Sequence, residues 1–464
     1  MSKNHIAIPH QRVFLAMLLL SSAFSCSRKT SSALEPLPLT SPPAMQSSQL
    51  NVRIHISRTL LDGTINHLIH KQFGEGLQFE DGIRIDTRLD GPVSIQASGQ
   101  ELLLQLPLHL DIIPGGIFSS FKMNGGLSLQ LKSKYAVLEN QLHFKTELTH
   151  HQWTKKPVVQ ILGLSLPIEG LANFVIRRYR QSLCTSMDAS VMENLRLHEM
   201  GQSLAKYFNQ PLYRSFDDQL NVYANPLEFA LGPLRMSPTS LEIPVTAFFE
   251  TVLSDSLPEG FGSTIQFSVR PFAEENSELY LQSRIPLPLI ERLLNEQISG
   301  QTYGSGMSRV GISSLKAGGV ANRMYVLAET TGAFDGDLQL SFVPVYDFSN
   351  REIRLSDFQL RALQGKRINK ILFGIFKGVA ETRIRKTIED QINATIRDYE
   401  SNIHKLLDHT EVIPGIEVYG SLKQYSLSNI LFYQDRLYCD LHSTLKMDAE
   451  VKAIDTSKLI IGSF

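Results

Sequence analysis

Residues Glu101–Ile112, ELLLQLPLHLDI, alternate apolar and mixed positions with a period of two. Successive side chains of a β-strand point to opposite faces of its sheet, so this period predicts a strand with one buried face. That face would consist almost wholly of leucine. It could pack against the rest of the protein as an ordinary core, or it could line a cavity for an apolar ligand. Its members are Leu102, Leu104, Leu106, Leu108, Leu110 and Ile112.

Several further stretches alternate in the same way and predict strands. The tetrapeptide DFSN at residues 347–350 separates two of these stretches and predicts a hairpin turn. The additional predicted strands cover residues 126–133, 141–148, 323–330, 336–347 and 351–360.

Two pairs of segments align without gaps, which indicates an internal repeat. Ile56–Ile69 aligns with Ile285–Ile298, and the segment that begins at Val222 aligns with the one that begins at Val418. The first pair predicts, in each copy, a strand that leads into a short helix. Pro288 suits the first turn of the second helix, where its missing N–H leaves no hydrogen bond unmade. The order of the matches predicts two related halves.

Apolar side chains recur at steps of three or four residues from Ile368 to Leu407, which predicts a long helix with one continuous apolar stripe. Such a stripe needs an equally long partner groove, which a strongly curved antiparallel sheet would provide. We therefore predict an α+β fold built as a tandem repeat of two domains, residues 50–258 and 259–464. Each would be a highly twisted antiparallel sheet wrapped around a long helix.

The N-terminus resembles an export signal. A short basic region precedes the apolar run at residues 13–24, and Cys26 follows the segment SSAFS as the acylated cysteine of a bacterial lipobox follows its own recognition segment. Ala23 stands where leucine is commoner, and an ordinary cleaved signal with an incidental cysteine is the alternative. We predict a lipoprotein signal peptide with its anchor cysteine at residues 1–26. A tether rich in serine and proline would follow at residues 27–49.

Composition limits the possible functions. The chain has 464 residues, 42% of them hydrophobic and 20% charged, so it is typical of a globular protein of more than one domain. A net charge of -1 without a long basic run argues against nucleic-acid binding. After the leader, no apolar run reaches the roughly 20 residues that span a bilayer. Two other cysteines, Cys184 and Cys439, could form a disulfide after export or remain buried free thiols.

Recognisable catalytic and metal-binding motifs are absent. The sequence contains no G-x-S-x-G, no GxxxxGK[ST], no H-E-x-x-H and no CxxC pair. We therefore expect no metal and no cofactor, and we do not expect an enzyme. An enzyme with a site assembled from distant residues is a weaker alternative.

Three segments carry a resemblance to a family of bacterial exported lipoproteins, the domain of unknown function numbered 4403. They are Trp153–Ile168, Ile285–Tyr303 and Gly332–Leu360, of which the last, with its glycine–aspartate strand and PVYD hairpin, is the most specific. That family is similar in turn to the tubular lipid-binding proteins of the BPI-like and SMP-like group. The resemblance implies domains in which a twisted sheet surrounds a long helix and leaves an apolar groove.

The resemblance also implies a location and a class of ligand. We expect a protein of the bacterial cell envelope, anchored by lipid to the outer membrane and facing the periplasm. It would bind or transfer a lipid or other apolar ligand in a groove between sheet and long helix. The alternative is a structural or assembly protein of the envelope with no small ligand. The groove candidates are Leu102, Leu104, Leu106, Leu108, Leu110, Leu338, Leu340, Phe342, Ile375, Phe376 and Val379.

Overall fold

The computed structural model describes residues 39–454 with gaps. The predicted anchor Cys26 and the groove candidates Ile375, Phe376 and Val379 lie outside the described residues. The internal gaps are residues 74–76, 79–83, 114–122, 162–163, 168, 195–196, 216–218, 263, 273–275, 304–305, 307–308, 406 and 414, together with most of 368–403.

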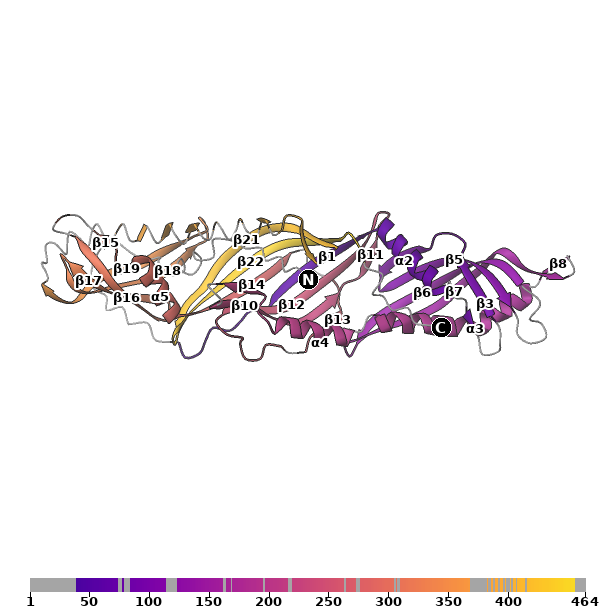
Figure 1. Ribbon diagram of the computed structural model, residues 1–464, viewed down its shortest axis with the longest axis horizontal. Coiled ribbons are helices and arrows are strands. Elements are labelled where there is room, and N and C mark those ends of the chain that lie inside the picture. Colours follow the sequence, from indigo (N-terminus) through magenta and orange to yellow (C-terminus); the bar gives the residue numbers. More distant parts are fainter. Residues whose placement is uncertain are drawn as a thin grey trace.

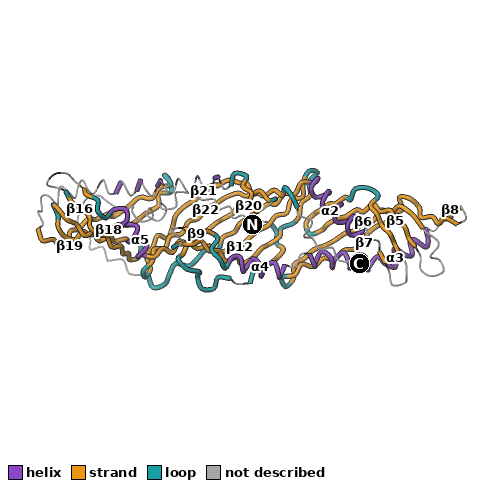
Figure 2. Tube along the Cα trace, viewed as in Figure 1, coloured by secondary structure: helices purple, strands orange, loops and turns teal. Residues whose placement is uncertain are grey.

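The molecule is elongated and consists mostly of antiparallel sheet, with helices packed along it (Figure 1, Figure 2). A central sheet lies between two end units. The first end unit and the central sheet together form one 17-stranded sheet, while the second end unit has its own sheet of five strands.

The central sheet brings strands from distant parts of the chain together. β1 and β14 lie end to end between β12 and β22, and they meet where Gln49 pairs with Glu278. β1 runs antiparallel to β12 and parallel to β22, whereas β14 runs antiparallel to β22 and parallel to β12. β10 and β21 flank β12 and β22. The six strands are β1 (Ser48–Ser57), β10 (Leu220–Leu231), β12 (Ser240–Ser254), β14 (Ser277–Pro286), β21 (Ile416–Tyr433) and β22 (Arg436–Val451).

The first end unit contains the leucine-rich strand. β5 pairs antiparallel with β6, with Leu106 opposite Leu129 and Leu108 opposite Leu127. Helix α2 follows β1, and helix α3 packs along β7. The elements are α2 (Arg58–Phe73), β2 (Leu77–Gln78), β3 (Arg84–Leu89), β4 (Ser94–Gly99), β5 (Glu101–Ile113), β6 (Met123–Leu138), β7 (Gln141–Ile161), β8 (Leu164–Pro167) and α3 (Glu169–Asn194).

The second end unit follows β14 and opens with a short helix. Its sheet is a simple antiparallel meander in which each strand from β15 to β19 pairs with the next. Its elements are α5 (Leu287–Ile298), β15 (Thr302–Tyr303), β16 (Val310–Val320), β17 (Arg323–Gly332), β18 (Asp335–Asp347) and β19 (Glu352–Arg367). The remaining elements are α4 (Leu197–Phe208), β9 (Tyr213–Ser215), β11 (Leu234–Met236), β13 (Gln266–Val269) and β20 (Thr410–Ile413).

The local predictions from periodicity are confirmed. Each stretch predicted as a strand lies in a strand, from β5 to the pair β18 and β19, except that Arg351 belongs to the turn that joins that pair. The two aligned openers become α2 and α5, and Pro288 lies in the first turn of α5. Most of the predicted long helix at residues 368–407 is outside the described residues; its described positions between 382 and 405 are helical.

Candidate functional site

The leucine face of β5 is mostly protein core. Leu106, Leu108 and Leu110 are buried in one cluster with leucines of β6 and with Cys184 of α3. Helix α3 covers this cluster with further apolar side chains, including Leu183. Leu104 is partly exposed and packs at the margin of the cluster, and Leu102 is also partly exposed. The packing accounts for three of the five leucines without a ligand, because their side chains already contact other side chains.

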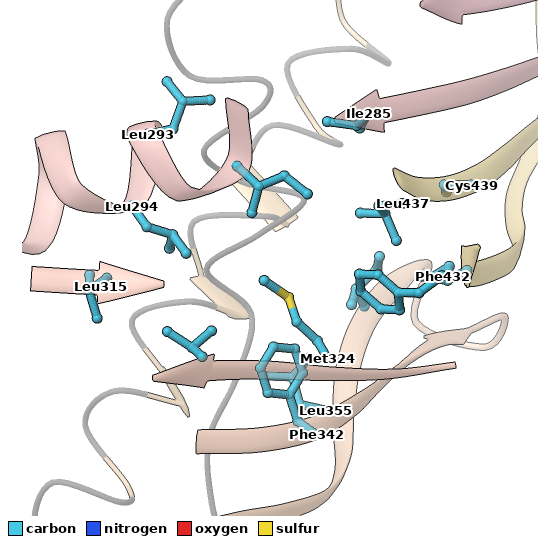
Figure 3. Packing of buried hydrophobic residues seen from close by; sticks show 14 of the residues in the cluster. Ile285, Leu293, Leu294, Leu315, Met324, Phe342, Leu355, Phe432, Leu437 and Cys439 are labelled. Atoms are coloured by element: carbon cyan, nitrogen blue, oxygen red, sulfur yellow. The ribbon is translucent and has the colours of Figure 1, made fainter. Parts of the chain in front are cut away.

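The groove candidates of the second end unit are packed in the same way. Leu338 and Phe342 of β18 are buried in the largest of the three apolar clusters among the described residues, and Leu340 packs against it. Figure 3 shows Phe342 with other members of this cluster. Leu293 and Leu294 of α5 belong to this cluster. The apolar side of the five-stranded sheet is thus filled by α5 and by strand ends of the central sheet.

Polar side chains on helices accept hydrogen bonds from the backbone of neighbouring strands. Asp188 of α3 accepts hydrogen bonds from the backbone N–H and the hydroxyl of Thr146, at 3.1 and 2.5 Å. Asn393, one of the described helical positions between 382 and 405, accepts the N–H of Ile353 in β19 at 2.8 Å. Both contacts satisfy strand N–H groups from the helix side, so helix and sheet are held in a fixed position relative to each other.

The central sheet has an apolar face that the sequence did not single out. Where β12, β1 and β22 lie side by side, Val245, Val52 and Met447 form one row across the three strands. In the next row, Ile243 and Ile54 stand beside the buried Ala449. Apart from that alanine these side chains are partly exposed, and none belongs to the three buried clusters of the described residues.

This surface, which we name the central apolar face, extends along β1. It comprises the partly exposed residues Leu50, Val52, Ile54, Ile56, Ile243, Val245, Met447 and Val451. The sequence signal for it is the strict alternation of SQLNVRIHIS in β1. That period predicts a strand, but it gives no information on whether other elements cover the apolar side.

The opposite face of the same strands is polar and internally paired. Arg53 Nε lies 2.9 Å from Asp448 Oδ1, and His55 Nε2 lies 3.5 Å from the same oxygen. Farther along, His442 contacts Glu278 and stacks on the ring of Tyr280, with the ring centroids 4.4 Å apart. These pairs lie across strand boundaries and therefore help to hold the strands in register.

The two described cysteines are both free thiols. Cys184 belongs to the cluster of the first end unit, and Cys439 belongs to the cluster of the second. Burial raises the pKa of both, and that of Cys439 reaches about 12, with a smaller contribution from Asp440. The disulfide alternative is therefore not realised in this structure.

The described residues contain neither a group of potential metal ligands nor a helix of the membrane-spanning type. Three or more His, Cys, Asp and Glu side chains do not gather there as a metal ion would require. None of the helices in the described ranges combines the length and the hydropathy of a membrane-spanning segment.

Comparison with solved structures finds distant likenesses. A lipopolysaccharide binding protein is 10% identical, with 88% of this chain and 100% of that chain covered and a TM-score of 0.27. P47 of Clostridium botulinum E1 is 10% identical, with 87% and 98% covered and a TM-score of 0.23. P47 from Clostridium botulinum A2 is also 10% identical, with 87% and 97% covered and a TM-score of 0.25. TM-scores this far below 0.5 do not establish a common fold.

The sequence itself places the chain in a family. No curated protein matches it. The family described as "Domain of unknown function (DUF4403)" matches residues 46–451, which is most of the chain. This protein therefore belongs to the DUF4403 family.

Proposed function

We propose that this protein is a lipid-anchored envelope protein that binds or transfers a lipid or another apolar ligand, with the central apolar face as its binding surface. One observation carries the proposal. The rows around Val52 and Ile54 leave aliphatic side chains partly exposed in the middle of a sheet whose other face is polar and paired. A contiguous apolar surface that stays partly exposed is a place where apolar partners can bind.

The expected gain in free energy is sufficient for a specific ligand. Each CH2 group that leaves water contributes about 0.8 kcal/mol gross, so an acyl chain of about ten carbons contributes roughly 8 kcal/mol. That corresponds to a dissociation constant of about 1 μM before the cost of ordering the chain is subtracted. Binding of the acyl chain at this affinity would therefore need few polar contacts between ligand and protein.

The proposal includes two related halves of the tubular lipid-binding type. The pairings of β1 and β14 support it, because each strand is antiparallel to the closing strand of its own half and parallel to that of the other half. Each of these strands also leads directly into a short helix, α2 or α5. A long helix enclosed by the sheet in each half is part of the same proposal.

The anchor and the location are proposed from the leader. Acylation of Cys26 would hold the protein at the outer membrane on the periplasmic side, with the serine- and proline-rich segment as the tether. The amide of Gln282 in β14 donates to the carbonyl groups of Pro43 and Ala44, which supports a tether that joins the body at the central sheet. We propose a binding protein rather than an enzyme.

An envelope protein with a structural or assembly role and no small ligand is the second candidate. The burial of Leu106, Leu108 and Phe342 favours it, because protein side chains fill the places where a groove was expected. The two candidates differ in whether the central apolar face is occupied by a lipid.

Lipid extraction of the purified full-length protein, followed by mass spectrometry and titration with a fluorescent acyl probe, separates the two candidates. We expect co-purified lipid and saturable probe binding, and we expect Val52→Glu to reduce both. Val345→Glu is the matched control, since Val345 is 44% exposed in β18 and lies outside the central apolar face. Absence of lipid and of probe binding, or equal effects of the two variants, would refute the lipid-binding proposal.

A further inference from the structure

A pocket of about 400 Å³ lies on the first end unit, on the side of β5 that faces away from the buried leucine cluster. Its volume is within the range of small-ligand sites, which is about 300–1,000 Å³. β4, β5, β6 and the short β11 contribute to its wall. The residues that line it are Gln96, Ala97, Ser98, Glu101, Leu102, Leu103, Lys132 and Met236.

Cross-strand pairing explains why a polar group and an apolar group meet here. Gln96 of β4 stands opposite Leu103, and Leu103 in turn stands opposite Lys132 of β6. Directly paired residues of an antiparallel sheet project from the same face. Met236 of β11 adds a second apolar side chain from the neighbouring strand. The pocket is therefore amphipathic, with Leu103 and Met236 beside a row of polar side chains.

The charges around the pocket leave an excess of one positive charge. Lys132 Nζ lies 2.7 Å from Glu101 Oε2, and Lys134 Nζ lies 2.9 Å from Oε1 of the same carboxylate. The hydrogen bond from Lys132, and then that from Lys134, lowers the pKa of Glu101, so the carboxylate is ionised. The single carboxylate of Glu101 thus pairs with two ammonium groups. The next pair outward, Lys145 and Glu147, is balanced at 3.0 Å.

Two further polar groups point to a ligand with acceptor atoms. The Gln96 amide and the Ser98 hydroxyl are exposed at the pocket, and neither has a hydrogen-bond partner among the described residues. An amide and a hydroxyl can both donate to an anion. Together with Lys132 they supply three kinds of donor along one wall.

We propose that this pocket binds a small amphipathic anion. Its phosphate or carboxylate group accepts hydrogen bonds from Lys132, Gln96 and Ser98, and a short apolar part packs on Leu103 and Met236. Ammonium–anion hydrogen bonds are about twice as strong as neutral ones, which favours an acidic group over a neutral one. The site is separate from the central apolar face and does not depend on the proposed function.

The same acidic amphiphile can be a free molecule or the headgroup region of a lipid. Titrations of the full-length protein with hexyl phosphate and with phosphatidylglycerol vesicles distinguish these sources, and hexanol serves as the uncharged comparison. We expect saturable binding of at least one acidic probe, and binding of hexanol that is weaker by about tenfold or more. Absence of binding for both acidic probes, or equal binding of hexanol, would overturn the proposal.

Variants locate the site. Lys132→Gln should weaken binding of the acidic probe by about tenfold or more, because a charge-assisted contact is lost. Lys145→Gln removes a lysine whose side chain is 80% exposed and lies outside the pocket, and it should leave binding unchanged. Glu101→Gln should strengthen binding, because it frees both ammonium groups from their shared carboxylate. If Lys132→Gln and Lys145→Gln have equal effects, or if Glu101→Gln weakens binding, the assignment is wrong.

Discussion

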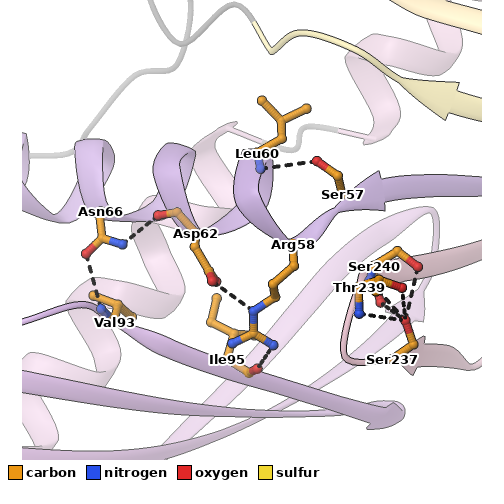
Figure 4. Close-up of polar contacts among 10 residues, drawn as sticks. All are labelled: Ser57, Arg58, Leu60, Asp62, Asn66, Val93, Ile95, Ser237, Thr239 and Ser240. Carbon is orange, nitrogen blue, oxygen red and sulfur yellow. Dashed lines mark hydrogen bonds and ion pairs between the residues drawn. The ribbon is translucent and has the colours of Figure 1, made fainter.

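Asn66 and Asn295 make the same two hydrogen bonds in two different short helices. Each donates through Nδ2 to the carbonyl group of the residue four positions earlier, at 2.6 Å for Asn66 and 2.8 Å for Asn295. Each also accepts a backbone N–H at Oδ1, from Val93 at 3.1 Å and from Leu315 at 2.8 Å (Figure 4 shows Asn66). The amide therefore links α2 to the chain before β4, and α5 to β16.

The Asn295 link should contribute measurably to stability. Asn295→Ala removes the acceptor of the Leu315 N–H and the donor to the Leu315 carbonyl, and leaves these strand groups unsatisfied. An unsatisfied buried polar group costs about 1–3 kcal/mol. We expect a loss of that size in urea unfolding of the full chain. Glu296→Ala, at a position 61% exposed on the same helix, should change stability little; equal losses would contradict the role of the link.

The leucine face of β5 should behave as core. Leu106 is 1% exposed in the cluster covered by α3, so Leu106→Ala should destabilise the protein by about 2–5 kcal/mol. Leu102→Ala on the same face should cost clearly less, because Leu102 is partly exposed and lies outside that cluster. Leu106→Asp should fail to fold. A folded Leu106→Asp protein that has lost acyl-probe binding would instead show that this face lines a cavity.

The pair of Asp255 and Arg436 should make stability depend on acid pH. Burial acts to raise the pKa of Asp255, but hydrogen bonds from Arg436, with smaller ones from Ser254 and Ser256, lower it overall. Arg436 holds the carboxylate through two contacts of 2.8 and 3.2 Å.

Because the folded pKa of Asp255 lies below the unfolded value of about 3.9, the stabilisation is complete above that pH and disappears as the pH falls through the folded pKa. We expect the difference in unfolding free energy between the native protein and Asp255→Asn to be constant from about pH 5 to 7 and to shrink below about pH 4. A difference that grows on acidification would disprove the assignment.

The two buried thiols should be unreactive in the folded protein. Burial raises the pKa of Cys184 and of Cys439, so the reactive thiolate is scarce at neutral pH. Iodoacetamide at pH 8 should label neither residue until denaturant is added, after which both should be alkylated without prior reduction. Mass spectrometry of the proteolytic peptides measures the alkylation of each cysteine. A requirement for reductant would indicate a disulfide.

The lipid anchor has a direct test. Cys26→Ser removes the residue that would be acylated, so the variant should appear in the soluble fraction of fractionated cells while the native protein stays with the membranes. Cys184→Ser is a control, because that thiol is buried in the body of the protein. Membrane association that is the same in all three proteins would refute the lipobox assignment.

Local elements could be predicted because their determinants are local. The period of two in β5 and in β18, and the turn between Asp347 and Glu352, depend on side chains that are near neighbours in sequence. The alignment of Asn66 with Asn295 found two residues with matching hydrogen bonds. The amphipathic pocket beside Lys132 could not be predicted, because it depends on how β4, β6 and β11 are placed around β5.

The sequence by itself determined the strands predicted from alternation, the apolar side of those strands, and the two short helices α2 and α5. Only the tertiary structure decided what covers those sides. Leu106 and Val52 follow the same alternating pattern, yet α3 covers the first and the second stays partly exposed between β12 and β22. Burial depends on contacts between distant segments, as the Arg53–Asp448 pair at a separation of 395 residues illustrates, and a local pattern carries no information about them.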